Sequence, residues 1–233
     1  MVVPAGPPGA LRSGSSSGGG PQPGLATPQP GPAPEHYFSP KPAVASEPAL
    51  VELRLPDVEL TLLADRGVFS SRRVDPGTLA LLKESPAPPP EGNLLDLGCG
   101  YGPIACALAA RAPAATVWAI EVNSRALQLT AANAKRLGLA NVRPAAPEEV
   151  PEAVRFAAIW SNPPVRVGKS ALHSLLATWL ARLAGGASAW LVVNRHLGGD
   201  SLAQWLASEG WAVRRAASKS GYRVLEVTYG VPR

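Results

Sequence analysis

The chain is poor in the residues that build disulfide frameworks and metal centres. It contains two cysteines, Cys99 and Cys106, and three scattered histidines, His36, His173 and His196. A disulfide-stabilised scaffold needs more cysteines, and a zinc site needs pairs of ligands at short spacing. We therefore expect neither a disulfide framework nor a bound metal ion.

Long apolar segments are missing as well. No run of apolar residues approaches the ~18 that a membrane-spanning helix needs. Prolines interrupt residues 1–12, where a secretory signal would have an uninterrupted apolar core. These absences predict a cytoplasmic protein without a membrane segment. With 46% hydrophobic residues, a chain of 233 residues is long enough for one sizeable α/β domain or two small ones.

Proline and glycine are concentrated at the N-terminus. Residues 1–40 contain ten prolines and eight glycines. Such a segment buries too little apolar area to offset the entropy lost on ordering, so we interpret residues 1–40 as a disordered tail. The net charge of +5 favours a polyanionic partner only weakly, because a solvated basic surface gives the same balance.

The pattern of apolar residues changes after this tail. Alternating apolar residues over 51–62, on either side of a Pro-Asp turn, predict a β-hairpin. Asp75 followed by Pro76 predicts the N-cap and the first residue of a helix. We therefore expect a hairpin-and-helix lead-in over residues 41–85.

Beyond the lead-in, over residues 90–233, short apolar runs alternate with segments of helical periodicity. This alternation predicts a doubly wound, mostly parallel α/β sheet with helices on both faces. Ligands bind such sheets at the carboxyl ends of the strands, where the strand order reverses. We expect Ser124 to cap one of the helices, and the helix that includes Leu172 to end only at Gly185.

A glycine-rich loop follows the first strand of this domain. Asp96 lies near the end of the strand, and the sequence G-C-G-Y-G follows at 98–102. A dinucleotide-binding loop has the spacing G-x-G-x-x-G and holds a pyrophosphate, which Asp96 would repel. Asp96 suits a positively charged amino group instead. Glu121, after the next strand, can accept hydrogen bonds from two ribose hydroxyls, with Asn123 near an adenine edge. The pattern favours an adenosyl cofactor.

A second motif, Asn162-Pro163-Pro164, follows the fourth strand, at the same carboxyl edge of the predicted sheet. The Asn162 side-chain oxygen and the Pro163 carbonyl can accept the two hydrogens of an amine and so fix the direction of its lone pair. The prolines keep this loop rigid, and the chemistry requires no ionised general base. We predict Asn162, Pro163 and Pro164 as catalytic residues.

These motifs resemble the class I S-adenosylmethionine-dependent methyltransferases, in particular the single-domain form of the small-subunit ribosomal RNA guanine-N2 methyltransferase family. The similarity covers about residues 36–230 and includes HYFS at 36–39, DRGVFS at 65–70, VDPGT at 74–78, NPPVRVGK at 162–169 and GYRVLE at 221–226. It implies a seven-stranded sheet with an antiparallel last strand, and S-adenosyl-L-methionine as cofactor. The cofactor-binding residues that follow are Asp96, Gly98, Cys99, Gly100, Gly102, Glu121, Val122, Asn123 and Asn162.

The sequence indicates the molecule that accepts the methyl group less clearly than it indicates the cofactor. Val165 stands where related N-methyltransferases often have an aromatic residue that stacks on the target base. Basic residues near the expected mouth, among them Arg195 and Lys219, either contact phosphates or stay solvated, and the sequence leaves both interpretations open. The predicted acceptor-binding residues are Phe69, Val165, Arg166, Lys169, Tyr222 and Arg223.

Three functions fit the whole pattern. The first is methylation of guanine N2 in ribosomal RNA, by a monomer or homodimer that acts on free RNA or on the small ribosomal subunit. The second is methylation of a protein glutamine or a small-molecule amine, which can use the same Asn-Pro-Pro geometry. The third is a non-catalytic relative that binds RNA.

Overall fold

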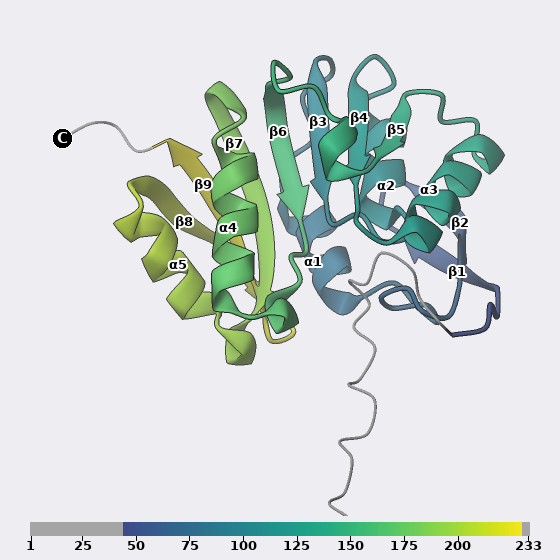
Figure 1. Ribbon diagram of the computed structural model, residues 1–233, viewed down its shortest axis with the longest axis horizontal. Helices are drawn as coiled ribbons and strands as arrows, with labels where there is room; N and C mark the ends of the chain where they lie inside the picture. Colours follow the sequence, from purple (N-terminus) through teal and green to yellow (C-terminus); the bar gives the residue numbers. More distant parts are fainter. Residues whose placement is uncertain (1–43, 230–233) are drawn as a thin grey trace, which may run out of the picture. The chain divides into compact units, whose positions relative to one another are not determined.

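The part of the chain that the computed structural model describes, residues 44–229, is built around a seven-stranded sheet (Figure 1). The predicted tail over 1–40 and the HYFS motif lie outside these residues. The strand order is β5-β4-β3-β6-β7-β9-β8. β9 pairs antiparallel with both of its neighbours, and the other pairs are parallel. The strands are β3 (Asn93–Leu97), β4 (Thr116–Ile120), β5 (Val142–Ala145), β6 (Phe156–Ser161), β7 (Leu183–Asn194), β8 (Trp211–Lys219) and β9 (Tyr222–Tyr229).

Successive strand residues face opposite sides of the sheet and bury two apolar cores. Leu94 and Trp160 belong to one core, and Leu95 and Ile159 to the other. Helices cover both cores, with α4 and α5 in front of the sheet in Figure 1. The predicted doubly wound, mostly parallel α/β fold with an antiparallel last strand is therefore confirmed. The helices are α1 (Pro76–Glu84), α2 (Pro103–Arg111) and α3 (Ser124–Arg136) on the first core, and α4 (Lys169–Leu180) and α5 (Gly199–Ser208) on the second.

The lead-in forms the expected hairpin and helix. β1 (Ala49–Arg54) and β2 (Glu59–Ala64) pair antiparallel as a separate two-stranded sheet, and their apolar faces join the first core. Asp75 accepts hydrogen bonds from Gly77 N at 2.8 Å and Thr78 N at 3.1 Å, with Pro76 as the first residue of α1. The predicted N-cap is confirmed. The division into a lead-in over 41–85 and a domain over 90–233 stays a prediction.

Two sequence-based boundaries are wrong. Asn123, not Ser124, caps α3, because its side chain accepts hydrogen bonds from Arg125 N at 3.0 Å and Ala126 N at 3.2 Å. The helix expected to reach Gly185 ends at Leu180, and β7 begins at Leu183. Leu183 pairs with Phe156 of β6 and is buried in the second core. It therefore belongs to strand β7, although its spacing from Leu172 also fits a helix.

No helix within residues 44–229 is long and apolar enough to cross a membrane. The same residues contain no group of three His, Cys, Asp or Glu side chains placed to hold a metal ion.

Candidate functional site

The glycine loop and the acid meet where β3 and β4 end side by side. Gly98 N and Cys99 N donate to the Ile120 carbonyl at 2.9 and 3.0 Å, which wraps the loop around the end of β4. Gly100 N donates to Glu121 Oε2 at 3.1 Å. The other Glu121 oxygen accepts from Val122 N at 2.7 Å and Asn123 N at 3.1 Å. Burial raises the pKa of Glu121, although these three amide hydrogen bonds oppose the rise.

The three glycines of the loop have different roles. Gly98 and Gly100 have φ of 77° and 57°, and a β-carbon at either would meet no atom within 4 Å, so the loop backbone is approachable from this side. Gly102 has φ of 88°, and a β-carbon there would lie 2.9 Å from Thr130. Glycine is therefore required at position 102 both by this backbone angle and by the close packing against Thr130 of α3. The Cys99 thiol lies in the core 3.6 Å from Thr130 Oγ1, which leaves only the Cys99 backbone on the ligand side.

Asp96 is fully buried directly below this loop. Its Oδ2 accepts a hydrogen bond from Ala105 N of α2 at 2.8 Å, whereas Oδ1 has no partner among the described residues. Burial raises the pKa of Asp96 to about 8, and the charge of Glu121 adds to the rise. A buried acceptor without a partner is costly. The site therefore fits a ligand that brings a cationic donor to Asp96.

Asn162 follows β6, on the other side of β3, so the strand order reverses between the glycine loop and the Asn-Pro-Pro motif. The Asn162 Nδ2 group donates to Asp75 Oδ2 at 2.9 Å and contacts Thr78 Oγ1 at 3.1 Å. The Pro163 carbonyl accepts a hydrogen bond from Val165 N at 2.8 Å, which leaves its second lone pair. Two elements far apart in sequence, α1 and the β6 loop, thus meet at Asn162.

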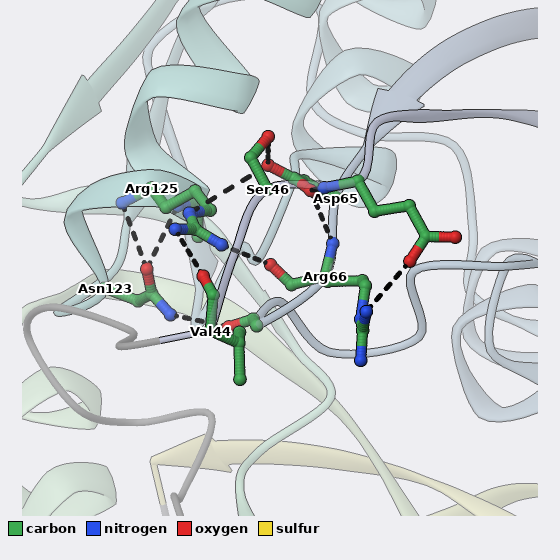
Figure 2. A network of polar contacts seen from close by, with 9 residues as sticks. Val44, Ser46, Asp65, Arg66, Asn123 and Arg125 are labelled. Atoms are coloured by element: carbon green, nitrogen blue, oxygen red, sulfur yellow. Dashed lines mark hydrogen bonds and ion pairs between the residues drawn. The ribbon is translucent and has the colours of Figure 1, made fainter.

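A polar network holds the loop after β2 beside the N-terminus of α3 (Figure 2). Asn123 Nδ2 donates to the Gly67 carbonyl at 3.0 Å. Arg125 donates to the Arg66 and Val44 carbonyls at 2.7 and 2.9 Å, and its Nε lies 3.9 Å from Asp65 Oδ2. The loop that leads to Phe69 is therefore fastened to the helix whose N-cap follows Glu121.

Tyr222 and Arg223, two of the predicted acceptor-binding residues, line a basic pocket beside this site. The pocket has a volume of about 380 Å³ and is lined by the β8–β9 turn and by Arg195 of η3 (Arg195–Leu197). Within residues 44–229, no carboxylate pairs with Arg195 or Arg215, whereas Arg223 pairs with Asp200 and Lys219 with Glu84. The remaining lining residues are Ser218, Ser220, Gly221 and Tyr222.

The other predicted acceptor residues lie elsewhere. Phe69 is 43% exposed in the loop after β2. Val165 and Arg166 belong to the short helix η2 (Val165–Val167), and Lys169 begins α4; both basic side chains are exposed. The pocket that contains Tyr222 and Arg223 does not include them.

The sequence missed the part that the lead-in plays in this site. It predicted Asp75 as a helix cap only, and gave Thr78 and Arg215 no role. A signal was present, because VDPGT at 74–78 is one of the motifs of the family resemblance. That motif did not indicate which residue Asp75 contacts.

A glycine loop after the first strand, an acid after the second and an Asn-Pro-Pro motif after the fourth define a methyltransferase of the Rossmann-like class. The family model of the methyltransferase small domain matches residues 59–226. The chain belongs to this family, and its identification as an S-adenosylmethionine-dependent methyltransferase is confirmed.

Individual relatives agree with this assignment. YbxB of Bacillus subtilis is 35% identical over 195 residues, which cover 82% of this chain and 97% of YbxB. Ribosomal RNA small subunit methyltransferase C of Aeromonas hydrophila is 36% identical over 126 residues, or 54% of this chain and 36% of that relative. The structure of the T. thermophilus 16S rRNA N2 G1207 methyltransferase (RsmC) with AdoMet and guanosine superposes with a TM-score of 0.68 at 27% identity. It covers 81% of this chain and 52% of the T. thermophilus chain, so the present chain spans about half of that protein.

Proposed function

We propose that this protein transfers a methyl group from S-adenosylmethionine to the exocyclic N2 amine of a guanine in ribosomal RNA. The observation that carries this proposal is the orientation of Asn162. Its amide nitrogen donates to Asp75 Oδ2 and Thr78 Oγ1, and its oxygen accepts no hydrogen bond from any of residues 44–229. The similarity to RsmC, whose structure contains AdoMet and guanosine, supports the choice of guanine N2.

The cofactor is expected to occupy the edge formed by β3 and β4. Asp96 Oδ1 would accept from the amino group, Glu121 would accept from the ribose hydroxyls, and the backbone of Gly98 and Gly100 would lie against the ligand. Val122, which is 45% exposed, offers an apolar surface beside them. When bound, the cofactor supplies an electrophilic methyl carbon attached to a sulfonium.

The acceptor nitrogen needs orientation more than activation. Its lone pair is delocalised into the base, and hydrogen bonds from its two hydrogens to Asn162 Oδ1 and the Pro163 carbonyl would turn that lone pair toward the methyl carbon. With the cofactor bound, the nitrogen–carbon bond would form as the carbon–sulfur bond breaks, and the amine would then release one proton to water. The residues around Asn162 therefore need no ionised base.

An RNA acceptor is supported by the basic pocket next to Tyr222. Arg195 and Arg215 line this pocket and have no carboxylate partner among residues 44–229. Guanidinium groups in this position suit phosphates of an RNA strand. A protein glutamine or a small amine has no phosphate that these two arginines could bind. Action in the cytoplasm, and as a monomer or a homodimer, stays an expectation.

The test is a labelling experiment. The purified protein is incubated with methyl-tritiated S-adenosylmethionine and either small ribosomal subunits, protein-free ribosomal RNA or subunit proteins. We expect label that RNase releases and that nucleoside analysis identifies as N2-methylguanosine. Label that only protease releases would support the glutamine alternative, and cofactor binding without any label on these acceptors would contradict the RNA proposal. Asn162→Ala serves as the matched inactive control.

A further inference from the structure

We propose that Asp75 and Thr78, at the start of α1, are positioning residues that hold the Asn162 side chain in the orientation that methyl transfer needs. This inference rests on the proposed function, because Asn162 has a catalytic task only if the acceptor is an amine. On this proposal, helix α1 of the lead-in contributes to the active site as well as to the stability of the fold.

The amide group of an asparagine side chain can take either of two orientations. An asparagine amide is nearly symmetric in shape but has an acceptor at one end and two donors at the other, so a rotation of 180° exchanges them. An amine substrate needs the oxygen to face it. The hydrogen-bond partner at the opposite end of the Asn162 amide therefore determines whether its oxygen faces the substrate amine.

The group that contacts the opposite end of Asn162 is the Asp75 carboxylate. An ionised carboxylate only accepts hydrogen bonds, and Asp75 Oδ2 lies 2.9 Å from Asn162 Nδ2. If the amide were reversed, two oxygens would face each other at this distance, and one of them would be charged. The Thr78 hydroxyl, 3.1 Å from the same nitrogen, accepts the second hydrogen. Asp75 thus selects one orientation, and Thr78 reinforces it.

The Asp75 carboxylate is itself held in place. The same Oδ2 atom accepts from Gly77 N at 2.8 Å and from Thr78 N at 3.1 Å, which ties the carboxylate to the N-terminus of α1. The free amides of a helix N-terminus stabilise a negative charge there. Leu81 and Leu82 are buried in the first core and anchor the helix. The orientation of Asn162 therefore depends on a rigid element.

The competing explanation is that Asp75 only caps α1, and two substitutions separate the roles. Serine is as good an N-cap as aspartate, but it is one atom shorter and cannot reach Asn162. In Asp75→Ser we expect kcat on RNA to fall ~10- to 100-fold, the scale expected when an orienting group is removed, while KM, cofactor Kd and Tm stay near the wild-type values. Asp75→Asn keeps the length and one acceptor oxygen and should restore most of kcat. An equal loss of kcat and Tm in both variants would overturn the proposal.

Thr78 provides a second matched pair. Thr78→Val keeps the shape of the side chain and removes the hydroxyl, whereas Thr78→Ser keeps the hydroxyl. We expect the valine variant to lower kcat less than Asp75→Ser does, and the serine variant to retain it. If serine lowers kcat as much as valine, the hydroxyl has no role in orienting Asn162.

A double-mutant cycle tests whether Asp75 acts through Asn162. Asp75→Ser should lower kcat in the wild type but not further in an Asn162→Ala background. The same fold-loss in both backgrounds would show that Asp75 acts by another route, and the proposal would be wrong.

The final measurement needs no turnover and separates this inference from the proposed function. The side-chain amide resonances of Asn162, assigned by their loss in Asn162→Ala, are followed by ¹H–¹⁵N NMR of the full chain. We expect Asp75→Ser to shift these resonances and to speed their exchange with water at least ~10-fold, since the bond that protects them is removed. Unchanged resonances would overturn the positioning role. If the wild type fails to methylate RNA, the proposed function fails, and the NMR result still decides whether Asp75 orients Asn162.

Discussion

The ring of Tyr222 lies directly against Gly77, where a β-carbon would fall 2.7 Å from Tyr222 Cε1 and equally close to Asp75 Oδ2. The first residue of β9 and the first turn of α1 therefore meet beside the carboxylate that binds Asn162. Burial, and then the charge of Asp75, raise the pKa of Tyr222 and keep its phenol neutral. Glycine at position 77 is required by this contact and not by its backbone angles.

Gly77→Ala should therefore damage the site more than the fold. The added methyl must displace Tyr222 or the Asp75 carboxylate, and overpacking of this kind costs ~1–3 kcal/mol of stability. We expect turnover on RNA to fall at least ~10-fold, as misplacement of an orienting group does, while cofactor Kd stays unchanged. Gly185→Ala in β7 is the control, because a β-carbon there meets no atom within 4 Å. Equal turnover in the two variants would show that the Gly77 contact has no bearing on catalysis.

Asn162→Ala removes the proposed acceptor for the amine. Turnover should fall by ~10²–10³-fold, the scale for one well-placed orienting group, with cofactor affinity largely intact. Single-turnover kinetics and calorimetry measure the two quantities separately. Wild-type turnover in this variant would refute the role assigned to Asn162.

Cofactor affinity should peak near pH 8. In the cofactor-free protein the pKa of Asp96 is about 8, so at lower pH the carboxyl must lose a proton before it can pair with an ammonium group. Affinity then falls by up to about tenfold per pH unit on the acid side. On the alkaline side it falls again, because an α-amino group loses its own proton with a pKa of about 8. Calorimetry at pH 7, in buffers of different ionisation enthalpy, should detect proton release on binding.

Asp96→Asn separates these effects. It should weaken cofactor binding and abolish the acid-side pH dependence. Because the pKa of Asp96 is raised from 3.8 to about 8, the wild type should lose stability as pH rises through this window, and the variant should not. A pH-independent affinity in the wild type would contradict the pairing of Asp96 with a cationic group.

Asn133 joins the lead-in hairpin to the glycine loop. Its side chain is fully buried, accepts from Leu63 N at 2.7 Å, and donates to the Leu63 and Tyr101 carbonyls, both at 2.9 Å. Asn133→Ala leaves these buried backbone groups unpaired and should lower the free energy of unfolding by ~3 kcal/mol. Urea denaturation measures the change, and Gln128→Ala on the exposed side of α3 should have almost no effect. Similar values for the two variants would show that the bridge does not stabilise the fold.

The basic pocket should determine the salt dependence of RNA binding. Replacing Arg195 or Arg215 by glutamine should weaken binding and lower the slope of log Kd against log salt by about 1 for each phosphate that is no longer neutralised. Arg136→Gln, at the exposed end of α3, changes the net charge equally and should leave the slope unchanged. If all three variants shift the slope alike, general charge rather than the pocket attracts RNA.

The cofactor side of the site was predictable because its signals are local. Asp96 and the glycines sit within one loop, and Glu121 and Asn123 follow the next strand, so adjacent parallel strands bring them together. Sequence patterns gave the wrong boundary where one segment fitted two structures or two residues could cap the same helix. Leu183 has helical spacing from Leu172 but pairs with Phe156, and Asn123 caps α3 although Ser124 is an equally good capping residue.

The sequence by itself determined the doubly wound sheet, the antiparallel last strand expected from the resemblance, and the residues at the carboxyl edges of the strands. These follow from periodicity and from motifs within single loops. Only the tertiary structure decided that Asp75 and Thr78 contact Asn162 and that Tyr222 packs on Gly77. Those contacts join α1, β6 and β9, which are brought together by burying one shared core. A residue pattern along the chain specifies which faces are buried, but not which polar groups meet when they are.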